Sequence, residues 1–116
     1  MDTVEAQRGL SVCYNRLGDI CEAEGDLSGA RELYLKCLEI CRTLAERTDT
    51  IETQRDISIC YEKLGNICKA EDDISAAREW YLKELEICRT LAASTDIVSI
   101  TYTIETMSSD ISTMKP

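Results

Sequence analysis

Apolar residues recur along the chain at intervals of three and four, which is the spacing of one face of an α-helix. They occupy two long stretches, residues 3–23 and 27–46, and the same pattern returns at residues 50–70 and 74–93. A short polar turn separates the two members of each pair, so each pair is expected to fold as an antiparallel helical hairpin. The pattern therefore predicts an all-α protein with four long helices.

Residues at the ends of these stretches are typical of helix boundaries. Asp2 and Asp49 each stand three residues before a Glu, which is the spacing of an N-cap and the third helical residue. Gly25 permits a tight turn, and Asp26 and Asp73 can each cap the helix that follows. The inward face of the 27–46 helix is expected to contain Leu27, Ala30, Tyr34, Cys37, Leu38, Cys41, Leu44 and Ala45.

The two predicted hairpins are copies of one unit. Residues 1–47 and 48–94 are identical at 30 of 47 aligned positions, with no gap in the alignment. We therefore expect a single domain over residues 1–116, in which repeat one (1–47) and repeat two (48–94) stack as an α-solenoid. The chain begins at a repeat boundary, which suits either a short gene product or a fragment of a longer array.

Residues 95–116 lose the repeat consensus but keep its apolar register. Val98, Ile104 and Met107 fall on positions that are apolar in the first copy. A helix over 97–113 with one apolar side would cover the open end of a solenoid, so the register predicts a C-terminal capping helix. The alternative is a strand or a disordered segment, because β-branched residues are frequent in this stretch.

A short motif recurs in both copies. Its positions in the first copy are Tyr14, Leu17, Gly18, Cys21, Ala30 and Tyr34. The motif resembles the signature of the tetratricopeptide repeat, W-x2-L-G-x2-Y followed by A-x3-F. Arg42 and Arg89 replace the terminal Pro of that family, and the period is 47 residues where the family has about 34. The chain is therefore similar to the long-repeat arrays common in bacteria, and the resemblance implies a right-handed solenoid with lengthened helices.

Charge and composition exclude several classes of function. The chain has 22 acidic and 13 basic residues and a net charge of −9, which opposes binding to nucleic acid and favours a basic or neutral protein or peptide partner. No apolar run is long enough to cross a membrane. The chain has no His, no Gly-rich phosphate loop and no dinucleotide fingerprint, so we expect neither an enzyme nor a cofactor.

Cysteines are frequent, and most of them repeat. They are Cys13, Cys21, Cys37, Cys41, Cys60, Cys68 and Cys88, of which six form three pairs at the 47-residue offset. Glu84 replaces Cys37 in the second copy, so the one-turn pair formed by Cys37 and Cys41 is not repeated. Without a C-x-x-C motif or a His, the pattern favours small buried side chains in a reducing cytoplasm over a metal or redox site.

The family resemblance implies that the first helices of the hairpins line a concave groove that binds a peptide or a partner's helix. The polar positions of these helices differ between the copies, which suits either partner-specific recognition or surface drift. The predicted groove residues are Asn15, Asp19, Glu22, Glu62, Asn66 and Lys69. The alternative function is an oligomerisation unit that self-associates through an apolar face of the second helices or through open repeat ends. Its candidate residues are Leu33, Leu35, Trp80 and Leu82.

Overall fold

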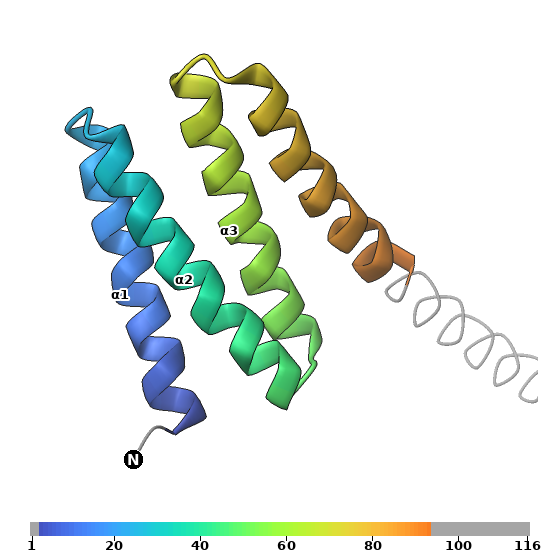
Figure 1. Ribbon diagram of the computed structural model, residues 1–116. Helices are drawn as coiled ribbons and strands as arrows, with labels where there is room; N and C mark the ends of the chain where they lie inside the picture. The colour runs from blue at the N-terminus through green and yellow to red at the C-terminus, as the bar shows by residue number, and fades with distance from the viewer. Residues whose placement is uncertain (1–2, 94–116) are drawn as a thin grey trace, which may run out of the picture.

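A computed structural model describes residues 3–93 and places them in four consecutive helices, with no strand in this part of the chain. The first three are α1 (Val4–Ala23), α2 (Leu27–Arg47) and α3 (Ile51–Ala70). The fourth helix, residues 74–93, continues the zigzag beside α3 (Figure 1). The predicted all-α fold is confirmed, and the limits of α1, α2 and α3 and the start of the fourth helix agree with the prediction to within one residue. The predicted end of the fourth helix falls at the last described residue, and the predicted cap at 97–113 lies outside the described residues.

Threonines begin the first helix of each repeat, one position after the predicted aspartates. Thr3 accepts a hydrogen bond of 3.0 Å from the backbone of the third residue of α1. Thr50 and Thr53 exchange side-chain to backbone hydrogen bonds in a capping box at the start of α3. Asp49 instead accepts a hydrogen bond from Gln54. Since both Thr and Asp are favourable N-cap residues, the sequence alone did not decide between adjacent positions.

The turn inside each hairpin depends on one residue with a positive φ angle. Gly25 has φ of 83°, and Asp72, its counterpart in the second repeat, has φ of 65°. Asp26 then accepts a hydrogen bond of 2.9 Å from the backbone near the start of α2, and Asp73 does the same for the fourth helix at 3.2 Å. The predicted turns and caps are therefore confirmed.

Helices within a hairpin approach each other closely at the glycine that both copies of the motif contain. A methyl group added to Gly18 would lie 2.5 Å from the Tyr34 ring, and one added to Gly65 would lie 2.5 Å from the Tyr81 ring. Ala30, one turn before Tyr34, is fully buried. The small residues thus make room for tyrosine rings from the second helix.

The core lies mainly between the two repeats, because α2 packs against both α1 and α3. Leu64 and Ile67 of α3 are 1% and 0% exposed. Leu17 and Ile20 are their counterparts on α1, and these are 54% and 56% exposed. The difference arises because α3 packs against α2 and also lies beside the fourth helix, whereas α1 packs closely against α2 and reaches α3 through side-chain ion pairs (Figure 1). The predicted inward face of α2 is confirmed.

Cysteine burial follows the same asymmetry. Cys60 and Cys68 on α3 are buried, as are the two cysteines of α2, but Cys13 is exposed. Cys88 on the fourth helix is exposed as well. The expectation that the cysteines are small core residues is therefore wrong for Cys13 and Cys88, because no described helix covers the outer faces of the first and fourth helices.

Candidate functional site

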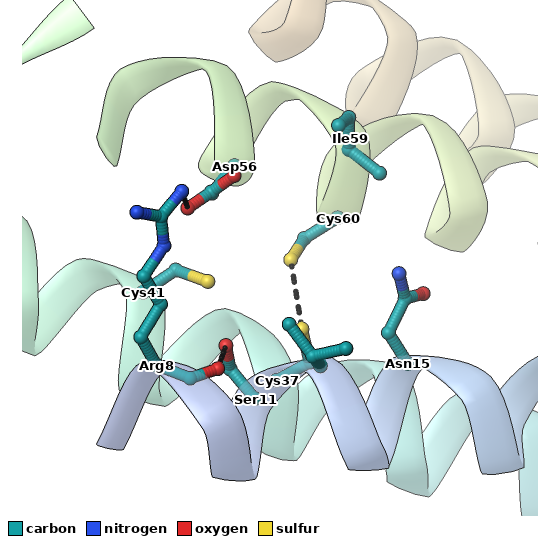
Figure 2. A pocket seen from close by; sticks show the side chains of 9 residues that line it. Arg8, Ser11, Asn15, Cys37, Cys41, Asp56, Ile59 and Cys60 are labelled. Atoms are coloured by element: carbon teal, nitrogen blue, oxygen red, sulfur yellow. Dashed lines mark hydrogen bonds and ion pairs between the residues drawn. The ribbon is translucent and has the colours of Figure 1, made fainter. Parts of the chain in front are cut away.

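A small cavity opens between α1 and α3, with α2 as its floor (Figure 2). We call it the central cavity; its volume is about 80 Å³. It lies on the side formed by the first helices of the two repeats, where the family resemblance predicts the binding groove. Its lining consists of Arg8, Ser11, Val12 and Asn15 from α1, Cys37 and Cys41 from α2, and Asp56, Ile59 and Cys60 from α3.

Ion pairs connect α1 to α3 on both sides of this cavity. Arg8 lies 2.5 Å from Glu52 and 3.3 Å from Asp56. Further along, the Lys63 ammonium donates a hydrogen bond of 2.6 Å to Asp19. These pairs are partly exposed, so each adds little to stability. Their geometric effect is to align the first helices of the two repeats.

Tyrosines from the second helices hold the polar residues of the first helices in position. The Tyr34 hydroxyl donates to Asp19 at 2.6 Å and also lies 3.0 Å from Glu22. Tyr81 donates to Asn66, the counterpart of Asp19. Burial of Asp19 opposes its ionisation, but hydrogen bonds from Lys63 and Tyr34 outweigh this effect and lower its pKa. Asp19 is therefore an oriented carboxylate.

The six predicted groove residues do not form one continuous group. Three of them, Asp19, Glu22 and Asn66, share the tyrosine contacts described above. Asn15 lines the central cavity beside the cysteines, as Figure 2 shows. Glu62 lies near Glu84, whose pKa is raised by burial and by the Glu62 carboxylate. Lys69 lies elsewhere, at the rim of an apolar hollow on the fourth helix.

That hollow, which we call the terminal hollow, has a volume of about 400 Å³. Its lining consists of Lys69, Ile74, Ala77, Arg78, Tyr81, Leu82 and Leu85. Ile74, Leu82 and Leu85 are all exposed there. The sequence pattern indicated Leu82 but not Ile74 and Leu85, whose counterparts in repeat one, Leu27 and Leu38, are half-buried and buried.

The four predicted self-association residues do not share one face. Trp80 packs against Tyr61, with ring centroids 5.8 Å apart, and is half-buried. Leu82 points instead into the terminal hollow, because residues two apart on a helix are separated by about 200°. In repeat one the equivalent residues also point in different directions, so Leu33 is half-buried and Leu35 is exposed.

Three thiols meet at the floor of the central cavity. The Sγ atoms of Cys37, Cys41 and Cys60 all lie within 4.8 Å of one another, and those of Cys37 and Cys60 are 3.4 Å apart. Hydrogen bonds from the Cys37 and Cys60 thiols, with help from Ser11, lower the pKa of Cys41 below its ordinary value. The hydrogen bond with Cys41 in turn raises the pKa of Cys37, and Cys37 and Cys41 together raise the pKa of Cys60.

The sequence pattern did not predict this thiol cluster. Cys37 and Cys41 are one turn apart on α2, which places them on the same face of the helix. Cys60 belongs to the next repeat, and its distance along the chain hides its proximity to them. The cluster could have been inferred from the solenoid register, because stacked repeats place the first helix of repeat two against the second helix of repeat one.

None of the helices in residues 3–93 combines the length and the apolar content that crossing a bilayer requires. A comparison with curated proteins gives no match. A comparison with protein-family models matches residues 9–73, more than half of the chain, to the tetratricopeptide repeat. Repeats of this family form a non-catalytic scaffold and generally mediate protein–protein interaction. On its sequence motif, its stacked hairpins and this match, the chain belongs to the tetratricopeptide repeat family.

Proposed function

We propose that the chain is a non-enzymatic interaction module that binds a peptide or a helix of a partner protein along the surface formed by α1 and α3. The observation that carries the proposal is the row of oriented polar side chains on this surface. The Tyr34 hydroxyl donates a hydrogen bond to Asp19, and the Tyr81 hydroxyl donates one to Asn66. Lys63 of α3 donates a hydrogen bond to Asp19 of α1 and so connects the two helices. Side chains fixed before binding lose less conformational entropy when a ligand arrives.

The chemistry of the surface favours a basic or neutral partner. Acidic residues exceed basic residues by nine over the whole chain. Asp19 is partly neutralised by Lys63, whereas Glu62 lies on the exposed side of α3 close to a second carboxyl group, that of Glu84. A Lys or Arg of the partner would relieve the repulsion between these two carboxyl groups.

Charge reversal on α3 tests this proposal. The variant Glu62→Lys, Asn66→Lys is expected to weaken binding at least about tenfold, because it replaces the negative charge of Glu62 beside Glu84 with positive charge. Partners are first captured by cross-linking from source lysate and identified by mass spectrometry. The affinity of each purified partner is then measured by calorimetry.

The matched control is the variant Glu32→Lys, Glu79→Lys. Both residues are exposed on second helices, and each stands two positions from an inward-facing tyrosine, so each points away from the proposed surface. This control should bind as tightly as the unmodified chain. Equal affinities for the α3 variant, the control and the unmodified chain, with every partner found, would rule out the proposed surface.

A second candidate function is head-to-tail self-association, in which α1 of one copy covers the terminal hollow of the next. The exposed Leu17 and Ile20 on α1 are counterparts of residues that pack on α2 from α3. The exposed Ile74 and Leu85 in the hollow are counterparts of Leu27, which is half-buried against the core, and of Leu38, which is buried in it. A second copy bound at the terminal hollow would therefore repeat the α2–α3 interface that the chain already contains. For this reason we propose a second copy of the chain as the ligand of the hollow.

Light scattering over a range of concentrations tests self-association. The unmodified chain is expected to form oligomers that grow with concentration. Leu17→Glu at one end, or Leu82→Glu with Leu85→Glu at the other, should give monomers, because each variant places a charge in an apolar contact. A mixture of the two variants should form dimers that grow no further, since one intact face of each kind remains.

The control for this experiment is Leu35→Glu, the counterpart of Leu82 on α2. Leu35 is exposed but lies at neither open end of the stacked helices, so its replacement should leave the assembly unchanged. A chain that is monomeric at every concentration would remove this second function and leave the first untouched.

A further inference from the structure

The thiol cluster has the composition and spacing of a metal site. Its three sulfur atoms converge on one point from two helices, and all three cysteines are buried (Figure 2). Sulfur ligands of a tetrahedral Zn²⁺ lie about 2.3 Å from the ion, so they are about 3.8 Å from one another. The sulfur atoms here are separated by 3.4 Å in one pair and by no more than 4.8 Å in any pair. Side-chain shifts of about 1 Å or less would therefore complete the geometry.

The surroundings favour a divalent over a monovalent thiophilic ion. Three thiolates around Zn²⁺ leave one net negative charge, whereas Cu⁺ would leave two in a partly buried place. The Arg8 guanidinium stands beside the cluster, where it lines the same cavity and pairs with Asp56 at 3.3 Å. This cation also pairs with Glu52 at 2.5 Å, so an ion that leaves the least negative charge on the cluster suits the site better.

The fourth coordination position faces the central cavity. The cavity volume of about 80 Å³ exceeds the space that one water molecule needs. The arrangement thus provides three sulfur ligands and room for one oxygen ligand.

We propose that Cys37, Cys41 and Cys60 bind one Zn²⁺ per chain and thereby tie the two repeats together. The ion replaces whatever protons the three sulfur atoms carry, and these protons pass to solvent. Since two ligands come from α2 and one from α3, the bound ion fixes the packing between repeats. This role does not depend on the partner-binding surface proposed above.

Cobalt titration of the full chain tests the site. The chain is kept reduced and free of oxygen so that no disulfide forms, and Co²⁺ serves as the spectroscopic probe. One equivalent of Co²⁺ is expected to produce a thiolate-to-cobalt charge-transfer band together with the visible bands of a tetrahedral ion. One equivalent of Zn²⁺ should remove them. Cys37→Ser or Cys60→Ser should weaken binding by more than about a hundredfold, since even changes outside the ligand set cost 10–100-fold.

The repeat supplies matched controls. Cys13 is the counterpart of Cys60, Cys88 is the counterpart of Cys41, and both are exposed outside the cluster. Cys13→Ser and Cys88→Ser should therefore bind Co²⁺ like the unmodified chain. Absence of the charge-transfer band, its persistence in Cys37→Ser and Cys60→Ser, or its loss in either control would overturn the proposal.

A second measurement covers the case in which a cluster variant does not fold. In the unmodified chain, Zn²⁺ should slow the alkylation of Cys37, Cys41 and Cys60, as followed by mass spectrometry. The alkylation of Cys13 and Cys88 should keep its metal-free rate. Equal alkylation rates with and without Zn²⁺ at the three cluster cysteines would contradict the site independently of any substitution.

Discussion

Replacing Leu64 with Ala is expected to lower the free energy of unfolding by about 2–5 kcal/mol. Leu64 is 1% exposed and belongs to the core between α2 and α3. The substitution removes buried methyl groups and leaves a cavity that the packed helices can fill only in part. The loss is large compared with the total stability of about 5–15 kcal/mol that is usual for a domain. Urea unfolding followed by circular dichroism measures it.

The repeat offers a control of the same residue type at the equivalent position. Leu17 on α1 is 54% exposed, so Leu17→Ala removes much less buried surface and should cost under about 1 kcal/mol. The comparison must be made at concentrations where light scattering shows a monomer, because self-association would bury Leu17. Equal losses for the two variants would show that α1 is covered as fully as α3.

Gly18→Ala is expected to destabilise the chain by about 1–3 kcal/mol through overpacking. The new methyl group would lie 2.5 Å from a ring atom of Tyr34, and this ring is itself only 1% exposed. The tyrosine cannot move away without breaking its hydrogen bonds to Asp19 and Glu22. The higher helix propensity of Ala offsets up to about 1 kcal/mol of the cost.

Gly9 provides the matching control within the same helix. No neighbouring atom lies within 4 Å of a methyl group added there, and the residue is exposed. Gly9→Ala should therefore stabilise the chain by about 0.5–1 kcal/mol, through the helix propensity of Ala alone. Thermal unfolding of the two variants should shift the midpoint in opposite directions. A rise in both midpoints would contradict the close helix approach at Gly18.

The helices and turns could be predicted because they depend on residues close together in the chain. The three- and four-residue spacing placed all four helices, and Gly25 with Asp26 placed the first turn. The register of the caps was missed by one residue, since Thr3 and Thr50 are as able to accept the free N–H groups as the neighbouring aspartates.

The candidate site was only partly predictable. Polar residues on α1 and α3 could be selected from the helical period, but their hydrogen bonds to Tyr34 and Tyr81 required the crossing of the two helices in each hairpin. Asn15 and Lys69 have the same periodicity as Asp19 and Asn66, yet they line two different cavities. Periodicity gives the direction of a side chain on its own helix and does not give the side chain that it meets.

The sequence by itself determined the repeat, the helix count over residues 3–93 and the family. Only the tertiary structure decided which of two equivalent residues is buried, as it did for Leu64 and Leu17. It also brought Cys60 to the two cysteines of α2. The physical reason is that identical repeats have identical local preferences, whereas burial depends on how many neighbours a helix has. Position in the stack therefore distinguishes residues that the two copies have in common.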